Sequence, residues 1–287
     1  MLAIYKRELK SYFTSMTGYV FIAFFLAVIG IYFFIYNLLI GYANFEIVLS
    51  AVSFLFIVLM PILTMRIMTE DKKQKTDQLL LTSPVPPYQI VLGKYLSVLT
   101  IYLFVIAVIS TYPLILSQFG RVPFKSGYAS ILGFFLLGAS YLAIGLYISS
   151  MVESQVVSAV ITFVVILLTY YIDGIVGVLP VDNKSTLVIL SVAFLIICYI
   201  TYVNMKNAYF SIFLTILGEG ILFGIYFVEP TIYDGLIVKA TDWLSVMSRY
   251  SNFNLGVINL ADIVYFISII FVFLFLTVQS LKKRRWN

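Results

Sequence analysis

Histidine is missing from this chain of 287 residues, and cysteine occurs once, as Cys198. Without histidine the chain lacks the commonest general base and metal ligand, and a zinc-protease helix cannot form. One cysteine allows no disulfide and no cysteine-based metal site within a single chain. Cys198 stands in an apolar run, so we interpret it as a small packing residue.

Charged residues are also scarce, at 11% of the chain, whereas a soluble domain carries about 25%. Apolar residues make up 62%, and apolar runs long enough to cross a bilayer recur along the whole length. These features predict an all-α, polytopic membrane protein. Tyrosine and phenylalanine are abundant, and part of that excess is expected at the headgroup belts.

Eight stretches are expected to be transmembrane helices, because each is long enough, or nearly so, to cross the apolar core. They are residues 19–40, 47–67, 88–116, 128–150, 156–172, 187–203, 208–228 and 263–280. Residues 1–17 precede them with leucine, tyrosine and phenylalanine at helical spacing and lysine and arginine between, which predicts an amphipathic helix lying in the interface. A solvated basic leader is the alternative.

Positive residues predict the orientation. With the N-terminus in the cytoplasm, most lysines and arginines fall in cytoplasmic segments, including the run Lys282, Lys283, Arg284 and Arg285 at the end of the chain. The exception is the turn at residues 151–155, which has no positive charge. An even number of spans then places both termini inside. The net charge of +5 follows from this arrangement and does not indicate nucleic-acid binding.

The longest polar segment between two spans is residues 68–87. It contains charged residues, then the short apolar run Leu79-Leu80-Leu81, and ends in a proline-rich stretch. A charged loop between two spans must lie in water. A short helix that offers three leucines there is a docking surface for a soluble partner.

Motifs for an energy source are missing from the chain. Gly93-Lys94 is followed by Tyr95 and lacks the earlier glycine of a phosphate-binding loop, and no carboxylates are paired with catalytic spacing inside a span. If the chain moves a solute, the energy comes from an ion gradient or from a partner protein.

Glu219 lies midway along an expected span, between Gly218 and Gly220. A charge at that depth costs roughly 3 kcal/mol on insertion scales, so it should face protein or water. Two interpretations stay open: a carboxylate in a solute or proton path, or a protonated or hydrogen-bonded carboxyl that packs against a neighbouring helix. Asp173 and Asp262 stand near span ends and are expected to be interfacial, and Glu153 is expected to pair with a basic neighbour.

The largest outer segment is residues 229–262. Apolar residues recur there at helical spacing from Ile232 to Met247, which predicts an interfacial or re-entrant helix, with a plain surface loop as the alternative.

Several stretches together resemble the permeases of ABC type-2 transporters, and the nearest subgroup is the gliding-motility-associated permeases. The stretches are residues 6–15, 61–66, 76–84, 91–95, 143–150 with Gln155, 262–266 and 281–286. On this resemblance, residues 1–287 form one permease domain with an interfacial leading helix and a cytoplasmic coupling loop. Residues 187–228 are an inserted helical hairpin relative to the usual six-span core.

The resemblance implies a partner ATPase, which binds the ATP and magnesium, and a second permease subunit, identical or different. It implies no cofactor on this chain, contact with membrane lipid, export of an unidentified cargo, and the cytoplasmic membrane of a bacterium or archaeon. The coupling helix falls on Lys75, Thr76, Asp77, Gln78, Leu79, Leu80, Leu81 and Thr82. Two positions depart from the family. Lys75 precedes Thr76 where a glycine is usual, and Gln78 stands where a glutamate is usual.

Two other classes of function remain as alternatives. An ion-coupled secondary transporter would use Glu219, and its uptake would depend on pH or sodium without any partner. A membrane scaffold or a membrane-embedded enzyme would show neither an ATPase partner nor pH- or sodium-dependent uptake.

Overall fold

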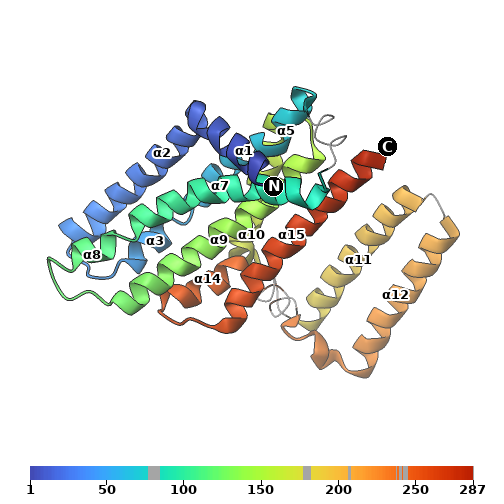
Figure 1. Ribbon diagram of the computed structural model, residues 1–287. Helices are drawn as coiled ribbons and strands as arrows, with labels where there is room; N and C mark the ends of the chain where they lie inside the picture. Colours follow the sequence, from blue (N-terminus) through green and yellow to red (C-terminus); the bar gives the residue numbers. More distant parts are fainter. Residues whose placement is uncertain are drawn as a thin grey trace. The chain divides into compact units, whose positions relative to one another are not determined.

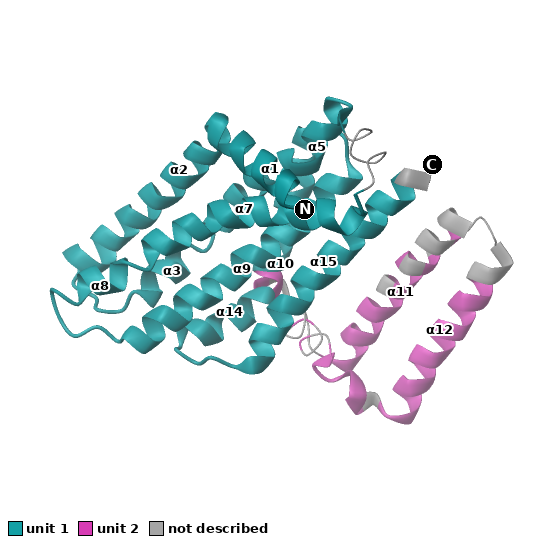
Figure 2. Ribbon diagram, in the orientation of Figure 1, with its two compact units in different colours: residues 1–170, 246–287 teal, residues 171–245 magenta. Residues whose placement is uncertain are grey.

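The computed structural model describes residues 1–76, 85–176, 182–205, 208–236, 238, 241 and 245–286. The described residues fold into helices joined by turns, in two compact units (Figures 1 and 2). The first unit holds residues 1–170 and 246–287, and the second holds residues 171–245. The predicted all-helical class is confirmed for these parts of the chain.

The first unit contains most of the helices. They are α1 (Leu2–Thr14), α2 (Met16–Phe33), the π-helix η1 (Phe34–Leu39), α3 (Glu46–Val52), α4 (Leu55–Thr64), α5 (Arg66–Lys73), α7 (Pro87–Ile109), α8 (Tyr112–Leu116), α9 (Phe124–Met151), most of α10 (Gln155–Val176), α14 (Val246–Asn254) and α15 (Leu260–Trp286). Figure 1 shows α2, α7, α9 and α15 running beside one another. The start of α1, the whole of α5 and the end of α15 lie towards one end of this unit.

Helix α9 is the centre of the first unit, and α3, α4, α5, α7, α14 and α15 all pack against it. Its small residues allow this close approach, as is usual between helices in membranes. A Cβ on Gly138 would overlap the ring of Tyr102, and one on Gly133 would overlap Phe253. Nearby, the rings of Phe56 and Phe134 lie 4.5 Å apart in a fully buried aromatic cluster.

Among the described residues, five helices are long and apolar enough to cross a membrane: Met16–Leu39, Pro87–Leu116, Phe124–Met151, Gln155–Gly174 and Leu260–Arg284. The expected second span is not one straight helix. It is the pair formed by α3 and α4–α5, bent by 62° at Ser53 and Phe54. Ser53 donates to the Ser50 carbonyl at 2.7 Å and shares a hydrogen bond of 2.8 Å with the Tyr170 hydroxyl, which stabilises the break.

The second unit holds the end of α10, α11 (Asn183–Met205), α12 (Ala208–Val228) and the 3-10 turn η2 (Pro230–Tyr233). Helices α11 and α12 pack together as the expected hairpin, and a Cβ on Gly218 would overlap the ring of Phe194. Their shorter apolar parts are Asn183–Ile196 and Ile212–Val228. The described residues therefore show a polytopic membrane protein with five or six candidate spans and two shorter apolar helices, and the count of eight stays a prediction.

The outer segment at residues 229–262 is described only in part, so the helix expected there stays a prediction. Residues 230–233 form the 3-10 turn η2, positions 236, 238 and 241 are helical, and α14 begins at Val246. Several positions of the expected helix, including 237, 239, 240 and 242–244, lie outside the described residues.

Candidate functional site

The polar end of the first unit is built around α5, which continues α4 beyond the apolar stretch and precedes the predicted coupling residues. Helix α4 ends at Thr64 and α5 begins at Arg66, with Met65 between them. Side chains of two other helices satisfy backbone groups there: the Tyr12 hydroxyl donates to the Leu63 carbonyl at 2.9 Å, and the Met68 amide donates to Ser149 Oγ at 3.1 Å. Burial raises the pKa of Tyr12, so this phenol stays protonated and remains a donor.

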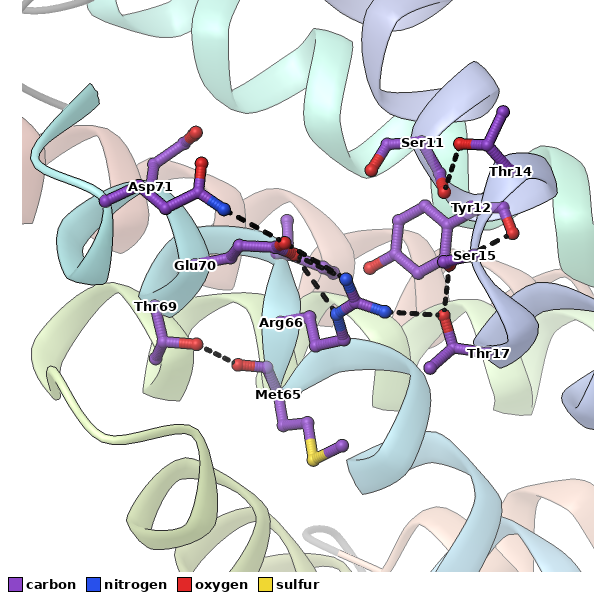
Figure 3. Close-up of polar contacts among 12 residues, drawn as sticks. Ser11, Tyr12, Thr14, Ser15, Thr17, Met65, Arg66, Thr69, Glu70 and Asp71 are labelled. Carbon is purple, nitrogen blue, oxygen red and sulfur yellow. Dashed lines mark hydrogen bonds and ion pairs between the residues drawn. The ribbon is translucent and has the colours of Figure 1, made fainter.

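Arg66 ties the first turn of α5 to the junction of α1 and α2 (Figure 3). Its Nε and Nη2 donate to the Glu70 carboxylate at 3.1 and 3.0 Å, and its Nη1 donates to Thr17 Oγ1 at 2.9 Å. Thr17 in turn shares a hydrogen bond of 2.7 Å with Ser15, the residue between α1 and α2. The guanidinium therefore holds the Glu70 side chain with two hydrogen bonds and links α5 to Thr17 at the start of α2 with a third.

Lys94 is the most deeply buried charge at this end, with 1% of its side chain exposed. Its ammonium donates to the Ile67 carbonyl at 2.6 Å and pairs with Asp71 Oδ2 at 2.5 Å and Glu8 Oε1 at 3.1 Å. Arg7 joins the same cluster through Glu8 at 2.7 Å and Asp71 at 3.3 Å. These two cations and two anions connect α1, α5 and α7.

The Asp71 carboxylate is held in its charged form. Burial by itself would raise the pKa of Asp71, but the charge and hydrogen bond of Lys94, the Thr76 hydroxyl and the charge of Arg7 together lower it below the usual value. Asp71 lies beyond the apolar stretch that ends at Ile67, so its carboxylate is at the water-facing end of the helix.

Lys72 connects α5 to the end of α9. Its ammonium donates to the carbonyls of Ser150 at 2.6 Å, Val152 at 2.7 Å and Ser149 at 3.3 Å. The last carbonyls of a helix have no hydrogen-bond partner within it and carry partial negative charge. A lysine placed there donates hydrogen bonds to them and also balances that charge.

A polar groove of about 240 Å³ opens between α1, α5 and α7. It is lined by Arg7, Glu8, Ser11, Arg66, Ile67, Glu70, Asp71, Gln74, Thr76 and Lys94. Cations and anions alternate along its walls and mostly neutralise one another, so the groove lacks the single-sign charge of an anion or metal site. Among the described residues, no group of three or more acidic, cysteine or histidine side chains could hold a metal ion.

The predicted coupling residues lie next to this cluster, and only their first two are described. Lys75 has a φ of 57°, a left-handed conformation that separates α5 from Thr76, and its coupling role stays a prediction. Thr76 follows it, and its hydroxyl donates to Asp71 Oδ1 at 2.9 Å. Residues 77–82, with the three leucines, lie outside the described residues.

Other predicted residues are distributed elsewhere. Glu219 lies on α12 in the second unit, and its Oε1 is enclosed without a hydrogen-bond partner among the described residues. Glu153 pairs with Arg284 at 3.3 Å, as expected. Asp262 is not simply interfacial: it is fully buried and accepts from Arg249 and Asn252, both at 2.9 Å, because α14 folds back onto the start of α15.

Sequence reasoning did not assign roles to Lys72, Asp71 and Lys94 in joining helices. A signal for Lys94 was present, since a lone lysine after Gly93 at the start of an apolar run should have a buried partner. No comparable signal marks Lys72, because the carbonyls that it binds belong to residues far along the chain.

These observations define a helical, multi-pass membrane protein whose one densely bonded polar end adjoins a charged loop. The sequence matches the family described as ABC-2 family transporter protein over residues 39–279, and the chain belongs to that family. It is therefore the transmembrane permease of an ABC-2 transporter, a class of subunit that relies on a partner ATPase. No curated protein and no solved structure matches the sequence.

Proposed function

We propose that this permease forms the translocation path of an ATP-driven exporter as one of two permease subunits. It binds separate ATPase subunits through the loop at residues 75–82, with Leu79, Leu80 and Leu81 as the apolar contact. The observation that carries the proposal is the attachment of α5. The helix that leads into this loop is bonded to α1, α7 and α9 through Asp71, Lys94 and Lys72. A helix that transmits a push from outside the membrane needs such rigid attachment.

The ends of the first unit support a cytoplasmic location for this loop. Glu153 and Arg284 are paired, so the α9–α10 turn and the end of α15 lie at the same end as α5. That end carries most of the positive charge, as expected for a cytoplasmic face. Both chain termini belong there in the proposed topology.

The second unit fits a count of eight spans. The chain leaves the first unit after Tyr170 and returns to it at Val246. Tyr170 lies near the far end of α10 from the α9–α10 turn. The chain returns at the opposite end from Arg284, because α14 packs on the beginning of α9, where Ser130 donates to the Phe253 carbonyl at 3.2 Å. Residues 171–245 then cross the membrane an even number of times, and α11 and α12 supply two crossings.

Export, the dimer and kinship with the gliding-motility-associated permeases rest on the sequence resemblance. In this proposal two permeases rock between inward- and outward-open forms as the ATPases close and separate. The inserted hairpin of α11 and α12 is an addition to the core that the ATPase drives.

The test is a double substitution, Leu79→Asp and Leu80→Asp, in the chain purified from its own host. We expect normal membrane insertion and loss of the co-purifying ATPase, because two carboxylates cannot enter an apolar groove without a large desolvation cost. The matched control is Phe119→Asp with Leu255→Asp, two outer-loop side chains that are each 76% exposed. An ATPase that is retained by the first variant as by the control contradicts the coupling role.

Glu219 supports a second candidate, an ion-coupled transporter, because one of its oxygens is enclosed without a described hydrogen-bond partner. That candidate requires pH- or sodium-dependent uptake by vesicles that contain this chain alone, and loss of the uptake in Glu219→Gln. Vesicles that transport only when an ATPase and ATP are present favour the exporter.

A further inference from the structure

The turn between α9 and α10 is very short: α9 ends at Met151 and α10 begins at Gln155. Over its last two turns α9 is in contact with α4 and α5 at three successive levels. Gly145 admits the Thr64 side chain, which a Cβ would overlap. Ser149 accepts from the Met68 amide, and the Lys72 ammonium closes the end of the helix.

The Lys72 contacts do more than cap a helix. The ammonium reaches past the last helical residue to the Val152 carbonyl, at 2.7 Å, which already belongs to the turn. Because only three residues separate the two helices, a displacement of Val152 must also displace the first turn of α10. Lys72 itself stands four residues before Thr76, at the end of the last described helix before the coupling loop.

The receiving helix α10 is packed less tightly in the first unit than α9 is. Within the first unit α10 is mostly exposed, whereas α9 is almost wholly buried. The turn is linked onward as well, since Glu153 pairs with Arg284 at the end of α15. A movement of α5 therefore has a bonded route to α10, and a weaker, exposed one to α15.

We propose that Lys72 is a positioning residue that transmits the displacement of the coupling loop to the α9–α10 turn. The inference rests on the proposed function, since the displacement is the one that a docked ATPase would impose. Lys94 and Arg66 hold α5 to α7 and to the α1–α2 junction, so they set its resting position. Lys72 makes the described side-chain bonds from α5 to the backbone of the turn.

A purely structural helix cap would lower stability when removed and would leave the nucleotide response of α10 unchanged. Removal of a transmitting residue predicts a different pattern. ATP hydrolysis continues in the complex, but the start of α10 no longer responds to nucleotide. These two roles are separated by measuring hydrolysis and movement on the same sample.

The experiment uses the chain in complex with its ATPase, with Cys198→Ser and a nitroxide on Val156→Cys, an exposed position in the first turn of α10. Its electron paramagnetic resonance spectrum is recorded without nucleotide and after trapping with ATP and vanadate. We expect a spectral change in the parent, the same change in the control Lys73→Met, and loss of the change in Lys72→Met with ATP hydrolysis retained. Lys72→Arg should preserve the response, because it keeps a cation beside the carbonyls.

An undiminished spectral change in Lys72→Met overturns the proposal. If that variant does not assemble with the ATPase, Lys72→Gln and Ser149→Ala decide the question. A lost response with continued hydrolysis supports the inference, and an unchanged response in both contradicts it. Failure of the proposed function can be told apart from failure of the inference about Lys72. In the first case the parent chain itself would bind no ATPase and show no response to nucleotide.

Discussion

Lys94 shows how one buried charge can organise a membrane protein at its water-facing end. The ammonium is almost fully enclosed, and it contacts two carboxylates and a carbonyl. Removing Lys94 leaves the half-exposed Arg7 as the one cation of the cluster beside two largely buried carboxylates, which is costlier than never having had the pair. The cluster therefore contributes specificity to the joining of α1, α5 and α7.

Replacing Lys94 by methionine should lower the free energy of unfolding by about 3–5 kcal/mol, the usual cost of breaking a buried ion pair from one side. The double variant Lys94→Met with Asp71→Asn should be less destabilised than the sum of its single variants, because the Asp71 charge that lost its Lys94 partner is then gone. Denaturant or thermal unfolding in detergent measures both, with Lys73→Met as the neighbouring control. Strict additivity of the two substitutions would contradict this account of the pair.

Asp71 also predicts a dependence of stability on pH. Its pKa is lower in the folded chain than in the unfolded one, so its stabilising contribution is fully present above the unfolded value, about 3.9. That contribution is lost as the pH falls from this value through the folded pKa. We expect the melting temperature to decrease over this acidic window, and to decrease less in Asp71→Asn. Equal acid sensitivity in the two proteins would show that Asp71 is not responsible.

Helix α9 shows the same logic at the scale of an element. Its glycines and serines let neighbouring helices such as α4, α7, α14 and α15 approach, and its end is held by Lys72 of α5. Around Met65, where α4 gives way to α5, Tyr12 and Ser149 bond backbone groups of Leu63 and Met68. The direction of α5 thus depends on α1 and α9 together.

Gly145→Ala should test this packing. The new Cβ would overlap the Thr64 side chain, so we expect a loss of about 1–3 kcal/mol in the free energy of unfolding, as is usual for overpacking. Gly220→Ala on α12, where nothing lies within 4 Å, should be neutral or slightly stabilising. The two variants are compared by thermal unfolding, and equal stability would mean that α4 and α9 do not meet so closely.

For the whole molecule, the proposed topology predicts which positions are accessible from outside an intact cell. With Cys198→Ser as background, Phe119→Cys and Leu255→Cys should react with a membrane-impermeant maleimide. Lys73→Cys and Glu153→Cys should react only after the cells are opened, since they belong to the proposed cytoplasmic end. Labelling of Lys73→Cys in sealed cells would reverse the orientation.

Much of the fold could be predicted from the sequence, because the length of an apolar run determines whether a helix can cross a bilayer. Helices α2, α7, α9, α10 and α15 cover predicted spans. The bend at Ser53 escaped prediction since it depends on Tyr170, far along the chain. The burial of Asp262 escaped for the same reason, because its partners come from α14, whose position is set by packing on α9.

The central claim is that a separate ATPase drives this permease through Leu79, Leu80 and Leu81. The most direct measurement places a photo-crosslinking amino acid at position 80 in living cells and identifies the adduct by mass spectrometry. The account predicts a cross-link to a subunit that carries a phosphate-binding loop, and no such adduct from position 119. A cross-link to lipid alone, or to a protein outside the cell, would contradict it.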